Sequence, residues 1–337
     1  MTTNLERLRR CSVAFDLGAA RTRVHLRDTG LIVDEPTVAA VNLRSGGLIA
    51  VGTLAEGMTG RTPDHVRVVR PVAAGTVVDI AIAQRMLRLL VGGKVRRAWR
   101  RRPLLSAAVC VPHDAEPLAC RAAVETLEGL GMRRVELVDN LIAASIGCGL
   151  PVDRAEAAMI VLCGTAVTQV AVLSLGSVVA ADRVPVGGEA LDRAFTQHLR
   201  DQYRLSLPDR AVRPLYLILR SGGAAVHGRD AATGRVRSVR VDAAGVWAAL
   251  EPPLRCVLDT IGAVLRRCPP DLVADLGDQG LVLAGGSATL PGLDMMLCRA
   301  TGMPVRVAQR PDLSAVRGLG AMVDGQVRPL LRDPLSV

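Results

Sequence analysis

Three short segments hold the residues whose types and spacing suit phosphate chemistry. The first places Asp16 two residues before Gly18, and the small residues Ala19 and Ala20 follow. The second repeats this shape around Gly164, with Leu162 in the place of the aspartate. Small residues in a tight turn let backbone N–H groups approach a phosphate, and a carboxylate at a strand end can hold the water around a Mg²⁺ ion. These segments therefore predict a phosphate site.

The third segment is Gly285-Gly286-Ser287-Ala288, at the end of an apolar stretch. Its glycines would let the backbone pack closely against a base or a ribose. Each of the three segments alone is equally consistent with an ordinary turn, because an aspartate or a strand before a glycine is common. Their order along one chain favours a nucleotide site over three unrelated turns.

The elements around these segments repeat in the two halves of the chain. The first half opens with expected strands at Cys11–Leu17, Arg23–Leu26 and Thr37–Asn42, and the second half with strands at Met159–Leu162, Val167–Leu175 and Ser177–Pro185. In both halves a glycine turn joins the first two strands. A repeated unit of this kind predicts an α/β protein with two similar domains and a ligand in the cleft between them.

Apolar periodicity places the remaining elements. Helices are expected at Ile80–Leu90, Pro117–Leu130, Leu141–Cys148, Ala190–Tyr203 and Ala243–Arg267, and further strands at Leu105–Val111, Val135–Val138 and Gly280–Leu283. The arginine- and glycine-rich segment Leu205–Val241 is expected to be irregular.

Composition narrows the classes of protein. A chain of 337 residues is long enough for two cores, and its formal net charge of +10 favours an anionic partner. The eight cysteines form no C-x-x-C pair and the five histidines are dispersed, so we expect reduced thiols in the cytosol and no metal cluster. No apolar run is long enough for a membrane span, and no zinc spacing or aromatic RNA platform indicates a nucleic-acid reader.

The motifs together resemble the MreB/Mbl family of bacterial actin-like proteins, from about residue 12 to residue 323. The stretch FDLGAARTRVHL is similar to the family's first phosphate loop, and LIAASIGCGLPV to its PMAAAIGAGLPV. The stretch VAVLSLGSVVAADRVPVGGEALDRAF follows the family pattern VAVISLGGIV…VGGDEMDEAI, and GLVLAGGSATLPGLDMML resembles its adenosine loop.

This resemblance implies an actin-like ATPase fold, with two ribonuclease H-like βββαβα cores that flank a nucleotide cleft. Domain I would span 1–150 with a small subdomain at 33–75, domain II would span 151–325 with one at 204–245, and 326–337 would form a tail. The implied ligand is ATP with Mg²⁺. Its binding residues would be Asp16, Gly18, Ala19, Ala20, Arg21, Gly164, Thr165, Ala166, Gly285, Gly286, Ser287 and Ala288.

Several positions depart from the family pattern. Leu162 replaces the aspartate of the second phosphate loop, and Asn140 replaces a glutamate that orients the attacking water. Asp16, as an indirect Mg²⁺ residue, and Asn140 remain the candidates for positioning metal or water, and Arg21 is a candidate to compensate near the phosphates. Pro214, beside Arg213, is expected to break the ribose-gripping helix. We therefore expect weak ATP binding with impaired hydrolysis, and enzymatic activity is left open with the balance against it.

The basic stretch 94–102 surrounds a tryptophan and is the candidate membrane contact, through Trp99, Arg97, Arg100 and Arg101. The resemblance implies a cytoskeletal or scaffold protein of cell shape and wall synthesis, cytoplasmic and peripheral to the inner face of the cell membrane. Its expected partners are itself or a complete MreB paralogue in a filament, membrane proteins of the MreC/RodZ type, and anionic lipid; no nucleic acid is expected. The alternatives are a slow ATPase or phosphotransferase of the same superfamily, and an arginine-rich nucleic-acid binder.

Overall fold

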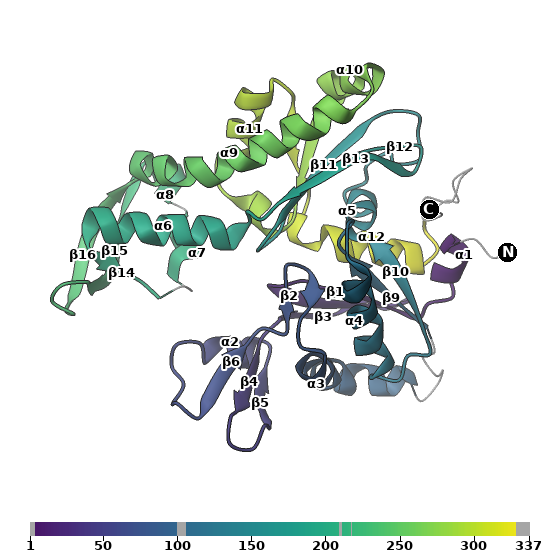
Figure 1. Ribbon diagram of the computed structural model, residues 1–337, viewed down its shortest axis with the longest axis horizontal. Coiled ribbons are helices and arrows are strands. Elements are labelled where there is room, and N and C mark those ends of the chain that lie inside the picture. Colours follow the sequence, from purple (N-terminus) through teal and green to yellow (C-terminus); the bar gives the residue numbers. More distant parts are fainter. Residues whose placement is uncertain (1–3, 100–105, 209–210, 217, 328–337) are drawn as a thin grey trace. The chain divides into compact units, whose positions relative to one another are not determined.

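A computed structural model describes residues 4–99, 106–208, 211–216 and 218–327. The chain forms two compact α/β units, traced in Figure 1. Unit 1 comprises Met1–Glu156, Ser174–Val178 and Leu313–Val337, and unit 2 comprises Ala157–Leu173 and Val179–Asp312. Each unit is built on its own five-stranded sheet, which confirms the predicted α/β class. The third strand of the unit 1 sheet is Gly30–Pro36, whereas the strand expected at Thr37–Asn42 is shorter, Ala39–Asn42, and belongs to a smaller sheet.

The sheet of unit 1 has the strand order β10-β9-β1-β2-β3. Strands β1, β9 and β10 are parallel, whereas β1, β2 and β3 form an antiparallel meander. The apolar residues that alternate along β1, such as Val13 and Phe15, pack with the helices α3 and α4 on one face. The bounds are β1 Val13–Leu17, β2 Arg21–Leu26, β3 Gly30–Pro36, β9 Ser106–Val111, β10 Arg134–Asp139, α3 Ile80–Trp99 and α4 Pro117–Glu128.

Two helices from distant parts of the sequence pack together on unit 1: α5 (Asn140–Gly147) and α12 (Ser314–Val323). Their backbones approach so closely that a Cβ at Gly318 would overlap the carbonyl oxygen of Ala143. Helix α12 also contacts β1, β2 and β9. Residues 314–323 were expected in the second domain. They lie in unit 1 instead, because Gly318 of α12 and Gly147 of α5 let the two helices pack closely.

Smaller elements complete unit 1. Strands β4, β5 and β6 form a three-stranded sheet with a core of its own around Val38, Ala40 and Ala55, within the segment expected to be a subdomain. The bounds are α1 Asn4–Leu8, β4 Ala39–Asn42, β5 Leu48–Val51, α2 Thr53–Gly57, β6 Val66–Val69, β7 Val72–Ala73 and β8 Thr76–Val77.

The sheet of unit 2 has the order β13-β12-β11-β17-β18, with β11, β17 and β18 parallel. Its core joins the sheet to Phe195 and Leu199 of α6 and to Val257 and Ile261 of α9. The bounds are β11 Ala158–Cys163, β12 Thr168–Ser174, β13 Ser177–Val184, β17 Leu281–Ala284, β18 Val305–Val307, α6 Gly188–Tyr203, α9 Ala243–Arg267, α10 Pro270–Gln279 and α11 Leu293–Thr301.

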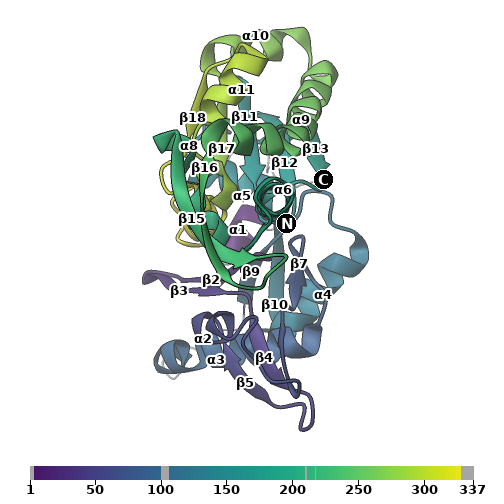
Figure 2. The ribbon, with the colours of Figure 1, turned by 90° about the vertical axis from the view of Figure 1, so that its left-hand side faces the viewer.

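The segment expected to be irregular between residues 205 and 241 is regular in the structure. Strand β14 joins the hairpin β15-β16 in a second small sheet, whose twisted ribbon is clear in Figure 2. The bounds are β14 Leu205–Ser206, α7 Val212–Leu215, α8 Ile218–Ser221, β15 Gly223–Asp230 and β16 Val236–Asp242. Most of β16 is exposed, including Arg237 and Arg240, and Val241 is its one buried residue, so the segment lacks the alternation that identifies a half-buried strand. Among the described residues, no helix is long and apolar enough to cross a membrane.

Candidate functional site

The first glycine turn joins β1 to β2 in unit 1. The amide of Gly18 donates to the carbonyl oxygen of Arg21 over 3.1 Å, which leaves Ala19 and Ala20 as a two-residue loop. A Cβ at Gly18 would lie 2.8 Å from that same carbonyl oxygen. Only glycine therefore allows the backbone to close the turn at this position.

The second turn, in unit 2, has the same construction. The amide of Gly164 donates to the carbonyl oxygen of Val167 over 3.0 Å, and Thr165 and Ala166 form the loop between β11 and β12. A Cβ at Gly164 would lie 2.7 Å from the Val167 oxygen. The backbone of this turn is therefore equivalent to that of the first.

The carbonyl oxygens of both loops are held by neighbouring segments. Thr37 Oγ1 donates to Gly18 over 2.7 Å, and Ser287 Oγ donates to Gly164 over 2.8 Å. Backbone amides also donate to Ala20 and Thr165. Because N–H and C=O point opposite ways across a peptide, the loop amides face away from these partners. Within the part of the chain that the structure describes, four loop amides have no backbone acceptor: those of Ala19, Ala20, Thr165 and Ala166.

The third segment lies against the second turn within unit 2. Gly285 has φ +86°, and a Cβ there would overlap the carbonyl oxygen of Cys163 at the end of β11. Gly286 begins a 3₁₀ turn, η2 (Gly286–Thr289), and has open space around its α-carbon. The structure thus brings Gly164, Gly285, Gly286 and Ser287 together, as the sequence predicted. The side chain of Ala288 is 2% exposed and belongs to the core, so it cannot contact a ligand.

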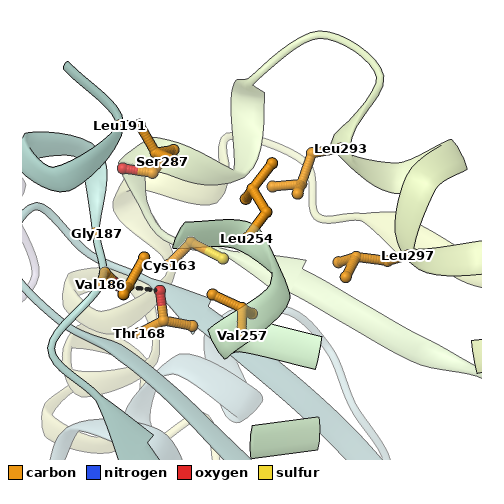
Figure 3. Close-up of a pocket in the computed structure, with 10 residues that line it drawn as sticks. All are labelled: Cys163, Thr168, Val186, Gly187, Leu191, Leu254, Val257, Ser287, Leu293 and Leu297. Atoms are coloured by element: carbon orange, nitrogen blue, oxygen red, sulfur yellow. Dashed lines mark hydrogen bonds between the residues drawn. The ribbon is translucent and has the colours of Figure 1, made fainter. Parts of the chain in front are cut away.

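A small pocket lies beside the second turn, and Figure 3 shows its lining. Thr168 Oγ1 donates to the carbonyl oxygen of Val186 over 2.6 Å at its edge. Apolar side chains from α9 and α11, including Leu254 and Leu297, form the rest of the wall. The cavity measures about 10 Å³, enough for one water molecule and too small for a nucleotide. It is a packing gap behind the turn and no binding site.

Asp16 lies at one end of a row of cross-strand neighbours. It pairs with Arg23 of β2, and Arg23 in turn pairs with Asp34 of β3. The Nε of Arg23 lies 3.1 Å from Asp34 Oδ1. Burial raises the pKa of Asp16 to about 6, although Arg23 opposes the rise. Near neutral pH this carboxylate is therefore charged but easily protonated.

Arg21 differs from its expected role as a phosphate ligand. Its Nε lies 2.5 Å from Asp34 Oδ1, and its Nη2 donates to the carbonyl oxygen of Asp34 over 2.7 Å. Two of the three guanidinium nitrogens thus bind one residue of β3. Arg21 therefore fixes the strand edge beside the turn.

Leu162 occupies in unit 2 the position of Asp16 in unit 1. It pairs with Gln169 of β12 and with Ala284 of β17. An isobutyl group accepts no hydrogen bond, and neither pairing partner is charged. The edge of the second turn therefore lacks the acid that the family pattern places there.

Asn140 begins helix α5, at the carboxyl end of β10. Its Oδ1 is buried and has no hydrogen-bond partner among the described residues, whereas Asp139 caps the helix by accepting from the amide of Leu141 over 2.8 Å. His113, which follows β9, makes a short ion-paired hydrogen bond to the other oxygen of Asp139. That bond is the main cause of the raised pKa of His113. The carboxyl ends of three parallel strands thus gather Asp16, Asp139, Asn140 and His113.

Sequence reasoning missed two of these residues, Arg23 and His113. Each had a detectable signal. Arg23 lies two residues after Arg21, on the same face of the strand that follows the turn. His113 follows Val111-Pro112 at the end of a strand, where polar residues gather in parallel sheets.

Pro214 does not break a helix in the way the sequence analysis expected. It is the third residue of the four-residue helix α7, where the missing N–H has no intrahelical acceptor to lose. Arg213, with a side chain 57% exposed, lies 3.4 Å from Asp192 Oδ2, and Tyr216 donates to Asp192 Oδ1 over 2.9 Å. The segment is held to α6 by this acid.

Of the four candidate membrane residues, two lie within the described part of the chain and two lie outside it. Helix α3 continues past Leu90 to Trp99, so Arg97 and Trp99 lie on a helix and not on a loop. Arg100 and Arg101 lie outside the described residues.

Comparisons with known proteins agree with this geometry. The sequence model of the MreB/Mbl protein family matches residues 10–329. The cell shape-determining protein MreB of Escherichia coli K12 is 33% identical over 323 residues, which cover 93% of each chain. The chain belongs to the MreB/Mbl family. The cell shape-determining protein Mbl of Bacillus subtilis 168 is 28% identical, with 93% of this chain and 95% of that protein covered.

Solved structures of MreB-like proteins share the fold. The MreB5 protein of Spiroplasma citri bound to ADP superposes with a TM-score of 0.84 at 21% identity, covering 91% of this chain and 94% of its own. The MamK double helical filament gives 0.74 at 18% identity, covering 94% and 99%. The fold is therefore actin-like, as the sequence motifs predicted.

Proposed function

We propose that this chain is a cytoskeletal protein of cell shape that assembles into filaments, alone or with a complete MreB paralogue, and binds ATP weakly with impaired hydrolysis. The observation that carries the proposal is a family match over residues 10–329 combined with two intact glycine turns and a missing acid at Leu162. The relatives are named cell shape-determining proteins, and the MamK neighbour is a filament.

Nucleotide binding is supported by the groups that each unit presents. The two loops offer four amides without backbone acceptors, and Gly286 leaves open space where a base or ribose would need backbone contact. The buried, unpartnered Oδ1 of Asn140 is a polar atom that a bound ligand or its water could satisfy. The S. citri neighbours were solved with ADP and AMPPNP.

Impaired hydrolysis follows from the side chains. An aspartate at position 162 and a glutamate at position 140 would position cation and water, and neither Leu162 nor Asn140 can act as a base. Removal of such positioned groups costs about 2–4 kcal/mol each in transition-state stabilisation, or several powers of ten in rate together.

Three measurements on the purified full chain test this proposal. Titration with a fluorescent ATP analogue should give saturable binding, phosphate release should stay near the no-protein rate, and sedimentation should pellet the protein with nucleotide or with a complete MreB. Failure to bind ATP even at millimolar nucleotide would remove the nucleotide part. Release at rates typical of active relatives would overturn the claim of impaired hydrolysis.

Membrane contact at the inner face is a second part of the proposal, through the basic stretch that ends α3 and continues beyond it. A tryptophan among arginines favours an anionic interface, and each cation adds about 1 kcal/mol there. We expect sedimentation with anionic but not neutral vesicles, and Trp99→Ala should weaken it more than Trp247→Ala, a tryptophan packed in unit 2. Shape proteins of the MreC/RodZ type would then be its membrane partners, which co-purification from membranes would test.

A slow ATPase is a second candidate function, because the pair His113–Asp139 lies beside Asn140. An aspartate that holds a histidine is a common arrangement for a general base. Because the bond to Asp139 raises the pKa of His113, its imidazole becomes available as a base only as pH rises, so hydrolysis through it should increase with pH and disappear in His113→Asn. A rate that is flat with pH in both proteins would leave the scaffold function alone.

A further inference from the structure

An acid–base–acid row crosses three strands of unit 1 beside the first turn. Asp34, Arg23 and Asp16 are cross-strand neighbours on β3, β2 and β1, so their side chains project from the same face of the sheet. The Nε of Arg23 lies 3.1 Å from Asp34 Oδ1, and the Arg23 side chain is only 9% exposed. The guanidinium is thus fixed beside the carboxylate of Asp16.

A guanidinium in this position is a permanent charge. Arginine does not lose its proton in proteins, and a buried one stays only where acids balance it. Asp34 is shared with Arg21 at 2.5 Å, so the second acid available to Arg23 is Asp16. Two acids and two arginines therefore form a neutral set around the turn without any added cation.

A magnesium ion does not fit the residues on the two turns. Mg²⁺ is held through carboxylates and ordered water and needs net negative charge around it. The Asp16 carboxylate already faces a guanidinium, and Leu162, its counterpart in unit 2, is paired with Gln169 and Ala284. Within the described segments, no group of three or more His, Cys, Asp or Glu side chains could hold a metal. The expected role of Asp16 with Mg²⁺ is thus not supported by its surroundings.

We propose that this chain binds nucleotide phosphates without a divalent cation, because Arg23, fixed beside the first turn, neutralises the Asp16 carboxylate that Mg²⁺ would otherwise balance. The inference rests on the proposed nucleotide binding and goes beyond it by stating which cation accompanies the nucleotide. The amides of Ala19 and Ala20 at the first turn remain direct phosphate donors, and Asp16 becomes the partner of an arginine instead of a metal.

The decisive measurement is the dissociation constant for a fluorescent ATP analogue in excess EDTA and in excess Mg²⁺. We expect the two constants to agree within about threefold, a difference of well under one tenfold step in affinity. Binding that needs Mg²⁺, or that tightens about tenfold or more with it, overturns the inference while the proposed nucleotide binding stands. Absence of binding in both buffers removes the nucleotide proposal and this inference with it.

Two substitutions separate the resident arginine from a metal site. Asp16→Asn should leave binding in EDTA unchanged or tighter, because it removes an acid that repels phosphate; a site that uses Mg²⁺ would lose affinity in Mg²⁺ buffer. Arg23→Met should weaken binding in EDTA by about tenfold, whereas Arg67→Met, the same change on exposed β6, should have no effect. Thermal unfolding of each variant checks that it is folded, and the Asp16→Asn result decides the question if Arg23→Met is not.

Leu162→Asp tests the inference in the opposite direction. It restores a carboxylate at the second turn, where its cross-strand neighbours are Gln169 and Ala284 and not an arginine. Binding in Mg²⁺ should then exceed binding in EDTA by about tenfold. Equal constants in the two buffers for this variant would show that the missing acid does not explain cation independence and would overturn the inference.

Discussion

The two glycine turns have the same backbone and opposite surroundings. Each closes with an amide-to-carbonyl bond, 3.1 Å at Gly18 and 3.0 Å at Gly164, and each excludes a Cβ by the same oxygen. Two residue pairs before the closure, unit 1 places Asp16 opposite Arg23, and unit 2 places Leu162 opposite Gln169. The glycine therefore fixes the shape of each turn, whereas the charge beside the turn is set by neighbouring residues that can change independently.

The strand next to each turn deepens this contrast. In unit 2, β17 ends at Ala284, level with Leu162, and the next residue, Gly285, contacts the backbone of β11 directly. In unit 1, the corresponding strand β9 ends before His113, whose side chain binds Asp139. Unit 2 thus builds its edge from close backbone contact, and unit 1 builds it from ionisable side chains.

The largest expected effect is at the backbone contact of unit 2. Gly285→Ala should destabilise the protein by about 3 kcal/mol or more, because the new Cβ meets the Cys163 carbonyl and φ is +86°. Gly286→Ala, the adjacent control with open space, should cost under about 1 kcal/mol. Denaturant unfolding measures both, and equal costs would contradict the close approach.

The equivalence of the turns predicts equal costs for Gly18→Ala and Gly164→Ala. Each new Cβ would lie 2.8 or 2.7 Å from a carbonyl oxygen of its own turn. Overpacking of this kind costs about 1–3 kcal/mol. A difference greater than about 1 kcal/mol between the two variants would show that the backbones are not equivalent. The measurement is the same unfolding titration, with each variant compared with the parent chain.

The sequence alone could predict the glycine turns and the two strands that each turn joins, because the residues that a tight turn requires are adjacent in the sequence. It also predicted Gly164 and Gly285 as parts of one site, because both follow apolar strands, and the structure places these two segments side by side. It could not place Arg23, because the partners of a buried guanidinium lie on other strands and depend on register. The same limit applied to β15 and β16, whose arginine-rich pattern concealed a hairpin, and to α12, which packs in unit 1 across more than 160 residues of intervening sequence.

The ionisable edge of unit 1 is tested by removing its helix cap. Asp139→Ala should destabilise the protein by about 2 kcal/mol, because it removes both the cap of α5 and the partner of His113. The stability contributed by the His113–Asp139 pair is present below the ordinary histidine pKa and is lost as pH rises through the raised pKa of His113. The cost should therefore be greater near pH 6 than near pH 9. Asn140→Ala, the neighbouring control, should cost less, since its Oδ1 has no partner; a cost equal to that of Asp139→Ala would contradict this account.

The smallest expected change in stability is at Asp16, where the substitution should stabilise the protein instead of destabilising it. Its pKa in the folded protein is about 6, above the ordinary value of 3.8, so between these values the folded state binds more protons than the unfolded state. Stability should therefore fall as pH rises from about 4 to about 6 and stay level above that.

Asp16→Asn removes this dependence and should stabilise the protein by about 1 kcal/mol near pH 7.5, with the gain shrinking toward pH 4. Leu162→Asn, the same final residue in the other turn, should destabilise at every pH, because it replaces an apolar side chain that carries no charge to relieve. Unfolding titrations at several pH values measure both variants. If Asp16→Asn destabilised the protein at neutral pH, the bond between Asp16 and Arg23 would outweigh the burial of the carboxylate. The first turn would then differ from the second by having a strong ion pair. It would no longer differ by burying a carboxylate whose charge is unfavourable.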